Sequence, residues 1–437
     1  MNVGFINQNI SPRLNMGLAY IMTMAQKKEQ VFFWDIVGRY QNFSHYVADE
    51  IEAVQPRAIG FSVNSYTFRS ALYWAHFIKQ RFPHIYLIFG GVHPTIRPFE
   101  CIRNPLVDII CIGEGEYAIS ECLDRLAAGE LPYNVPGIWF KDEAGRIIEN
   151  PLRSFVENLD ELPFPNWDIW DIERYIKVGG LVRNSLKILA SRGCYYDCKF
   201  CTAPVIRERI PGEYYRVRSA ENVIAEIKML RAKYYARGLR YISFADPLFG
   251  ANETQFDRLT ALYRAEGLAE ELPWICETRP EIITAEWTRR AHEAGCMVVS
   301  LGIESAEDMV RRHSLGKTIA DEQIATAIAN LEHNDILYIL YLILCAPGES
   351  FKTVFKTLKF AAQYNPIKTY FLFFLPLPET PLYEECQSSF LTHRDTKFDD
   401  GFWNRPNIRL RGINNLGYVW LRLHMFIMKV VLFFKSG

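Results

Sequence analysis

Apolar runs and amphipathic stretches alternate along the first third of the chain. Short apolar runs at 3–6, 30–36, 58–63, 85–89 and 107–112 are separated by helical patterns at 14–27, 43–54, 69–81 and 117–128. Such alternation is typical of a parallel sheet that is covered by helices on both faces. The pattern therefore predicts an open, doubly wound α/β domain over residues 1–130.

A stretch rich in turn residues follows at 131–183, and we interpret it as a linker. It contains a small hairpin pattern (138–141 and 146–148) and an aromatic cluster of Trp167, Trp170 and Tyr175. We expect this cluster to pack between two domains, with contact to a substrate cavity as the alternative.

The strand–helix alternation then starts again. Six further strand patterns occur at 186–191, 241–245, 273–278, 297–301, 337–344 and 369–375. Each ends in a polar or glycine-rich turn, and a helical pattern follows most of them. This predicts a partial (β/α)6 barrel over 184–390, with its active residues in the loops at the strand ends.

The remaining residues, 391–437, predict a helical C-terminal tail. Residues 416–435 are mostly apolar but include Arg422, His424 and Lys429. A membrane-spanning helix needs about 20 mostly apolar residues, and a central arginine is costly there. We therefore expect an amphipathic helix that packs on the protein; contact with a membrane surface is the less favoured alternative.

Composition narrows the class of protein. A chain of 437 residues is too long for one ordinary core, and its 49% hydrophobic and 23% charged residues are typical of globular proteins. A formal net charge of −1 provides no global field that would attract nucleic acid. The first residues lack a signal-peptide pattern, and seven of the ten cysteines are scattered singly, mostly in apolar segments. We expect a cytoplasmic protein in which those seven are small core residues.

The other three cysteines, Cys194, Cys198 and Cys201, lie together in one loop directly after a predicted strand. Thiolates are soft ligands that favour iron–sulfur clusters or zinc, which usually take four protein ligands. Three thiolates suit a 4Fe-4S cluster in which one iron keeps an open position. Half of a zinc site, or three core cysteines that happen to lie close together, are the alternatives.

The loop resembles the signature of the radical S-adenosylmethionine (SAM) superfamily, Cys-x3-Cys-x2-Cys with an aromatic residue, here Phe200, before the last cysteine. The resemblance implies that Cys194, Cys198 and Cys201 bind a 4Fe-4S cluster and that SAM binds the open iron. It also implies reductive cleavage of SAM to a 5′-deoxyadenosyl radical, with Phe200 packed near the adenine.

Other predicted strand ends resemble the superfamily in the same order. Gly302–Ser305 resembles the segment whose acid, here Glu304, accepts hydrogen bonds from the SAM ribose. Asp246 matches an acid that receives the methionyl amino group, although Pro247 stands where many relatives have a second acid. Arg279 could bind a carboxylate of SAM or substrate, or form a buried ion pair with Glu277, Glu281 or Glu304. Lys317 is interpreted as a surface cation.

The N-terminal strand ends carry Asn64-Ser65, Gly90-Gly91-Val92-His93-Pro94 and Gly113-Glu114-Gly115-Glu116. Together with Asn15–Tyr20, they resemble the cobalamin-binding domain that precedes many radical SAM domains. The resemblance makes candidate cobalamin contacts of Asn64, Ser65, Gly90, Gly91, His93, Glu114, Gly115 and Glu116. A sheet domain kept for structure or substrate binding is the alternative.

Simpler roles compete at several of these positions. The sequence has no Asp-x-His-x-x-Gly motif, so we do not expect His93 to ligate cobalt, and it could be a turn histidine that hydrogen-bonds backbone groups. Glu114 and Glu116 are better interpreted as carboxylates at a helix N-terminus. The strand-end glycines would let a bulky ligand approach the backbone closely.

Over nearly its whole length the chain resembles the cobalamin-type radical SAM group, which contains the anaerobic magnesium-protoporphyrin cyclase and many methyltransferases. The resemblance implies two uses of SAM, one as methyl source for cobalamin and one as radical source, to methylate an unactivated carbon of a small molecule. It also implies a reductant such as flavodoxin or ferredoxin and no nucleic-acid partner. The alternatives are radical oxidation, cyclisation or rearrangement without methyl transfer and, more remotely, a non-catalytic iron–sulfur electron-transfer protein.

Overall fold

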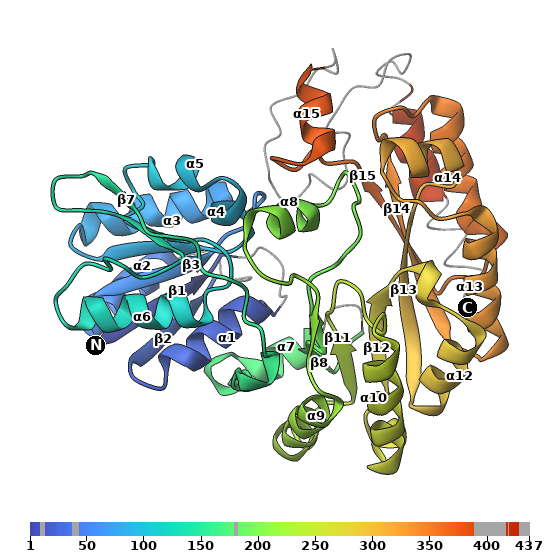
Figure 1. Cartoon of the computed structure of the whole chain (residues 1–437), viewed down its shortest axis with the longest axis horizontal. Helices are drawn as coiled ribbons and strands as arrows, with labels where there is room; N and C mark the ends of the chain where they lie inside the picture. Colours follow the sequence, from blue (N-terminus) through green and yellow to red (C-terminus); the bar gives the residue numbers. More distant parts are fainter. Residues whose placement is uncertain (9–13, 37–42, 179–181, 389–416, 418, 428–437) are drawn as a thin grey trace. The chain divides into compact units, whose positions relative to one another are not determined.

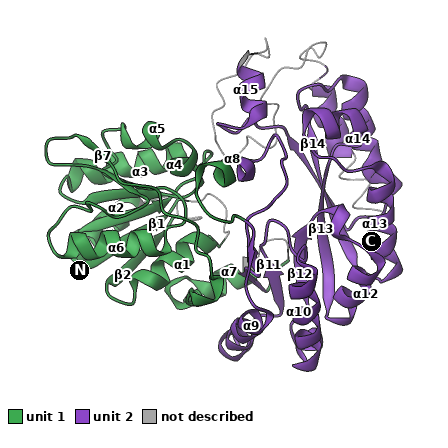
Figure 2. Ribbon diagram, viewed as in Figure 1, with its two compact units in different colours: residues 1–184, 205–214 green, residues 185–204, 215–437 purple. Residues whose placement is uncertain are grey.

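The structure is a computed structural model that describes residues 1–8, 14–36, 43–178, 182–388, 417 and 419–427. It divides into two compact units (Figure 2). The first comprises Met1–Asn184 and Val205–Tyr214, and the second Ser185–Pro204 and Tyr215–Gly437. Each unit is built around one sheet (Figure 1). No sequence pattern predicted that a segment so close behind the cysteine loop, Val205–Tyr214, belongs to the first unit.

The first unit contains a seven-stranded sheet of order β2-β1-β3-β4-β5-β6-β7. Its elements are β1 (Asn2–Asn7), α1 (Met16–Ala25), β2 (Gln30–Asp35), α2 (Phe43–Val54), β3 (Ala58–Ser62), α3 (Phe68–Arg81), β4 (Tyr86–Gly90), α4 (Val92–Ile96), α5 (Pro98–Ile102), β5 (Ile109–Cys111), α6 (Glu116–Ala127), β6 (Ile138–Lys141), β7 (Ile147–Glu149) and α7 (Ile172–Val178), with short 3-10 turns at Leu159–Glu161 and Trp167–Ile169. Strands β1 to β5 are parallel, which confirms the predicted doubly wound sheet.

The predicted hairpin does not stand apart in a linker, because β6 pairs antiparallel with β5 and extends this sheet. The side chain of Asp142 closes the turn of the hairpin. Oδ1 of Asp142 accepts hydrogen bonds from the backbone N–H of Ala144 at 3.0 Å and of Arg146 at 2.8 Å. Gly145 adopts the positive φ of 74° that the turn requires.

The aromatic cluster of the predicted linker has its described contacts within the first unit, rather than between domains as expected. The ring of Trp170 lies 4.4 Å from that of Phe33 on β2. The hydroxyl of Tyr175 donates to Oδ2 of Asp35 at 2.7 Å, at the carboxyl end of the same strand. The cluster thus covers one end of the first sheet.

The second unit contains six parallel strands in the order β15-β14-β13-β12-β11-β8. Its elements are β8 (Ser185–Ile188), β9 (Ser191–Arg192), α8 (Thr202–Arg209), β10 (Arg216–Val217), α9 (Ala220–Tyr234), β11 (Tyr241–Phe244), α10 (Glu253–Ala265), α11 (Leu268–Glu271), β12 (Trp274–Thr278), α12 (Ala285–Glu293), β13 (Cys296–Glu304), α13 (Asp321–His333), β14 (Leu337–Leu344), α14 (Phe351–Gln363), β15 (Lys368–Phe373) and α15 (Pro381–Ser388), with a 3-10 turn at Pro280–Ile282 and a π-turn at Val310–Ser314. Helix α8 begins in the second unit and ends in the first. The open parallel sheet with its helices confirms the predicted partial barrel.

The described part of the tail, 417 and 419–427, is helical. Leu421 and Met425 are buried, and the ring of Trp420 lies 4.7 Å from that of Phe351 and 5.3 Å from that of Phe355 on α14. These contacts confirm that the helix packs on the protein. Residues 391–416, 418 and 428–437 of the predicted tail lie outside the described residues. None of the described helices combines the length and apolar character needed to cross a membrane.

Candidate functional site

The three-cysteine loop leaves the first strand of the six-stranded sheet and is tied to two later segments. The backbone N–H of Lys199 donates to the carbonyl of Leu315 at 2.9 Å, and its Nζ donates to the carbonyl of His313 at 2.8 Å. The N–H of Leu382, in α15, donates to the carbonyl of Lys199 at 3.2 Å. Backbone bonds therefore fix the loop from both sides, as a rigid metal site requires.

The strand that enters the loop is held by a buried acid. Oδ1 of Asp246 accepts a hydrogen bond from the hydroxyl of Ser191 at 2.6 Å, and Oδ2 accepts one from the N–H of Ala190 at 3.1 Å. The residue is 1% exposed, and burial raises the pKa of its carboxyl to about 6. Both oxygens thus bind the strand that enters the loop, and each keeps a lone pair that can accept a further hydrogen bond.

The thiols of the loop lie within electrostatic reach of one another. Burial, followed by the charges of Cys198 and Cys194, raises the pKa of Cys201 to about 11. Burial also raises the pKa of Cys194, while Arg279 and Lys317 act in the opposite direction. Nearby cations stabilise thiolates, which are the form that ligates iron.

The loop provides three thiols without a disulfide among them, and an iron–sulfur cluster takes thiolate ligands of this kind. Phe200 is half-buried inside the turn, which the N–H of Cys201 closes on the carbonyl of Cys198 at 3.1 Å.

Arg279 reaches the loop from the end of β12. Its Nη1 donates to Sγ of Cys198 at 3.1 Å, and its guanidinium lies 3.6 Å from the ring centre of Tyr196. Nε donates to Oε1 of Glu281 at 3.1 Å, and Nη2 pairs with the same oxygen. The sequence left open either a carboxylate ligand or a buried ion pair for Arg279. In the structure Arg279 forms the ion pair, with Glu281.

Glu304 lies at the last residue of β13 and forms a buried ion pair. Its Oε1 is 3.1 Å from Nζ of Lys317, which also donates to the carbonyl of Gly302. Glu304 has a φ of 69°, a conformation that non-glycine residues rarely adopt and that often marks functional sites. The charge of Glu304 also contributes to the raised pKa of Cys201.

The interpretation of Lys317 as a surface cation is wrong, because the residue is 3% exposed. It is the main residue of the site that sequence reasoning missed. The sequence signal was the pair of apolar residues two positions before and after it, Leu315 and Ile319, and both are fully buried in the structure. A lysine between two core residues belongs to a buried segment and needs a partner there.

The strand-end residues of the first sheet form a second candidate site. The hydroxyl of Ser65 lies 3.1 Å from Nδ1 of His93, whose ring is 4.3 Å from that of Phe68. Burial and the charge of Arg97 lower the pKa of His93 to about 4, so its ring is neutral at pH 7. Its Nε2 is buried and has no hydrogen-bond partner in the described structure; Oε2 of Glu100 is 3.9 Å away, which is too far for a hydrogen bond. His93 therefore binds a side chain rather than backbone groups, and one buried polar atom at this edge is unsatisfied, which fits a ligand rich in amides such as cobalamin.

Most other residues of this edge bind the protein itself. Oδ1 of Asn64 accepts from the N–H of Thr67 at 2.9 Å, Oε2 of Glu114 accepts from the N–H of Val156 at 2.7 Å, and Glu116 begins α6. Two of the glycines, Gly91 and Gly115, likewise allow close packing of the chain. A Cβ on Gly91 would lie 2.8 Å from the carbonyl of Val63, and one on Gly115 would lie 2.9 Å from Cδ1 of Ile21. A Cβ on Gly90 would make only an ordinary contact.

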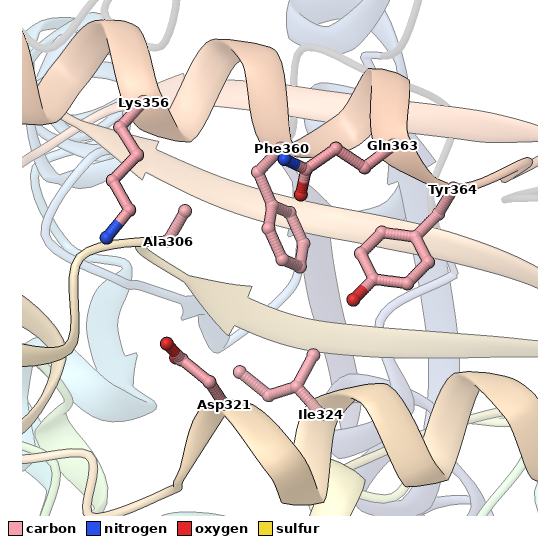
Figure 3. Close-up of a pocket in the computed structure, with 7 residues that line it drawn as sticks. All are labelled: Ala306, Asp321, Ile324, Lys356, Phe360, Gln363 and Tyr364. Atoms are coloured by element: carbon pink, nitrogen blue, oxygen red, sulfur yellow. The ribbon is translucent and has the colours of Figure 1, made fainter.

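A separate cavity of about 180 Å³ lies between α13 and α14 (Figure 3). Asp321 and Lys356 approach it from the two helices, with the ring of Phe360 beside them (Figure 3). The charges are already paired, Asp321 with Arg311 and Lys356 with Glu307. The cavity contains none of the residues that the sequence singled out.

Comparison with known proteins agrees with this arrangement. The family model described as "B12 binding domain" matches residues 14–123, and the model described as "Radical SAM superfamily" matches residues 188–361. An uncharacterized methyltransferase of Pyrococcus horikoshii is 28% identical over 370 residues, which is 84% of this chain and 77% of that protein. The anaerobic magnesium-protoporphyrin IX monomethyl ester cyclase of Rubrivivax gelatinosus is 25% identical over 345 residues, 78% of this chain but only 60% of the cyclase.

Among solved structures, the radical SAM methyltransferase TsrM from Kitasatospora setae, with cobalamin and a [4Fe-4S] cluster bound, superimposes with a TM-score of 0.72. The identity is 18%, and the match covers 88% of this chain and 78% of TsrM, so it shows a shared fold. The two family models imply a 4Fe-4S cluster, SAM and cobalamin as cofactors. The chain therefore belongs to the radical SAM superfamily, as an enzyme that carries a B12-binding domain ahead of its radical SAM domain.

Proposed function

We propose that this enzyme is a cobalamin-dependent radical SAM methyltransferase that methylates an unactivated carbon of a small molecule. One observation carries the proposal: the loop of Cys194, Cys198 and Cys201 shares a chain with a cobalamin-type sheet that has an unsatisfied His93 at its carboxyl edge. The methyltransferase relative from Pyrococcus horikoshii supports it. The substrate is a small molecule whose identity the proposal leaves open.

The residues have separate roles in this proposal. The three cysteines hold the cluster, and Phe200 packs near the adenine of SAM. Glu304 accepts hydrogen bonds from the ribose, and the buried Lys317 fixes its orientation. Asp246 holds the strand beneath the loop. When bound, the cluster, SAM and cobalamin supply an electron, a carbon radical and a methyl carrier, while the protein orients the reactants and excludes water.

The proposed cobalamin contacts are Asn64, Ser65, Gly90, Gly91, His93, Glu114, Gly115 and Glu116. Ser65 and His93 are the strongest of these, because their pair leaves Nε2 of the ring available for a hydrogen bond. We expect Glu114, Glu116 and the glycines to contribute mainly by shaping this edge. An external one-electron donor such as flavodoxin or ferredoxin would reduce the cluster.

The cyclase relative supports a second candidate function, in which the same cofactors oxidise or cyclise the substrate without methyl transfer. Incubation of a cell extract with the reconstituted enzyme, dithionite and SAM deuterated at its methyl group separates the two. Methyl transfer predicts a small-molecule product in which three deuterium atoms replace three hydrogen atoms of the product made with ordinary SAM. If the enzyme turns over and its product carries no label, the methyltransferase proposal is wrong.

A further inference from the structure

We propose that Arg279 tunes the iron–sulfur cluster by donating a hydrogen bond to the ligand sulfur of Cys198, and that this raises the reduction potential of the cluster. The inference rests on the proposed binding of a 4Fe-4S cluster by the three-cysteine loop. It assigns Arg279 to the cluster instead of to a carboxylate of SAM or substrate.

The geometry holds the guanidinium in one orientation. Arg279 is 6% exposed, and Nε and Nη2 both bind Oε1 of Glu281. The ring of Tyr196 covers the guanidinium, with Cζ 3.6 Å from the ring centre. These contacts direct Nη1 at Sγ of Cys198, 3.1 Å away. A planar donor held by a carboxylate and an aromatic ring loses little further entropy when it binds a third group.

Each guanidinium nitrogen already has a protein partner, because Nε and Nη2 bind Glu281 and Nη1 binds sulfur, and Tyr196 covers the guanidinium. Only the second N–H of Nη1 and of Nη2 is left for a carboxylate ligand.

A hydrogen bond and a positive charge at a ligand sulfur stabilise the more negative, reduced form of the cluster. Loss of both should therefore make the cluster harder to reduce. The effect matters for function because SAM cleavage needs an electron from the reduced cluster. Arg279 acts through the cluster, so it is a positioning and tuning residue rather than a catalytic one.

Redox potentiometry followed by electron paramagnetic resonance tests the proposal on the full chain after anaerobic reconstitution. Arg279→Gln should lower the midpoint potential by at least about 59 mV, which corresponds to a tenfold change in the one-electron reduction equilibrium. Arg289→Gln is the matched control, because Arg289 is likewise an ion-paired arginine, bound to Glu286 and Glu293, but lies half-exposed on α12. We expect its potential to equal that of the wild type. Full iron and sulfide content with an unchanged potential in Arg279→Gln would overturn the proposal.

A direct measurement covers the case in which Arg279→Gln does not retain a cluster. In protein labelled with ¹⁵N-arginine, the reduced cluster should show a ¹⁵N hyperfine coupling by pulsed electron paramagnetic resonance in the wild type and in Arg289→Gln. Arg279→Lys, which keeps the charge but contains no labelled nitrogen, should lose it. An absent coupling in a wild type that holds the reduced cluster contradicts this inference alone, whereas a wild type that binds no 4Fe-4S cluster contradicts the proposed function as well.

Discussion

Nζ of Lys317 lies 3.1 Å from Oε1 of Glu304, and both side chains are almost completely shielded from water. The pair joins the segment after the π-turn to the end of β13. It also places a carboxylate beside the three-cysteine loop.

Lys317→Met should destabilise the protein strongly, because it leaves the Glu304 carboxylate buried without its partner. Removal of one partner from a buried ion pair costs about 3–5 kcal/mol. Lys356→Met is the control, since Lys356 pairs with Glu307 at the same 3.1 Å distance but its side chain is 53% exposed. We expect the control to lose less than about 1 kcal/mol in urea denaturation. Equal losses in the two variants would show that the buried pair is unimportant.

Gly302→Ala should disturb the same pair by a steric route. A Cβ at this position would lie 3.0 Å from Nζ of Lys317 and would clash with Oε1 of Glu304. Overpacking of this kind costs about 1–3 kcal/mol. In contrast, Gly17→Ala on α1 places a Cβ no closer than 3.7 Å to its neighbours and should stabilise the helix by up to about 1 kcal/mol. Thermal unfolding of both variants checks the expected opposite signs.

The strand patterns predicted both sheets because buried parallel strands appear as continuous apolar runs. They could not predict that β13 continues to Glu304, since the register shifts between Gly302 and Glu304 and the glutamate adopts a positive φ. The partner of the Glu304 side chain, Lys317, is 13 residues away, so no local pattern contains the pair. For the same reason the sequence pointed to Asp246 as a site residue but not to its partner Ser191. The motif identifies the acid, whereas only the fold shows what it binds.

Glu349, in the loop after β14, should make stability depend on pH. Burial raises the pKa of its carboxyl to about 8, although hydrogen bonds from the N–H groups of Ala346 and Cys345 oppose the shift. The folded state therefore holds this proton more tightly than the unfolded state. Stability from this group is fully present below the unfolded pKa near 4.5 and is lost as pH rises towards 8, by about 1.4 kcal/mol per pH unit as an upper bound.

Glu349→Gln removes this titration and keeps an amide oxygen that can accept the same hydrogen bonds. The free energy of unfolding is measured from pH 5 to pH 8.5. As pH rises, the stability of the variant should increase relative to that of the wild type. Glu286→Gln, on the exposed face of α12, provides a comparison for nonspecific loss of charge. A constant difference between Glu349→Gln and the wild type across this range would rule out the assigned titration.

Leu421→Ala should release the C-terminal helix from α14. Leu421 is fully buried, and truncation of such a leucine costs about 2–5 kcal/mol of local stability. Leu423 lies two residues further on with 54% of its surface exposed, so Leu423→Ala should cost less than about 0.5 kcal/mol. Hydrogen exchange across 419–427 measures the difference. Equal protection in the two variants would contradict the described packing.

Incubation with labelled SAM tests whether one chain both cleaves SAM at a cluster and transfers a methyl group to cobalamin. The enzyme is purified anaerobically with cobalamin supplied and is then incubated with dithionite and SAM deuterated at the methyl group. We expect 5′-deoxyadenosine together with a trideuterated methyl group on the bound corrin, and loss of the 5′-deoxyadenosine in Cys198→Ser. If an intact 4Fe-4S cluster yields no 5′-deoxyadenosine, or if the protein yields it but retains no corrin, the chain is not a cobalamin-dependent radical SAM enzyme.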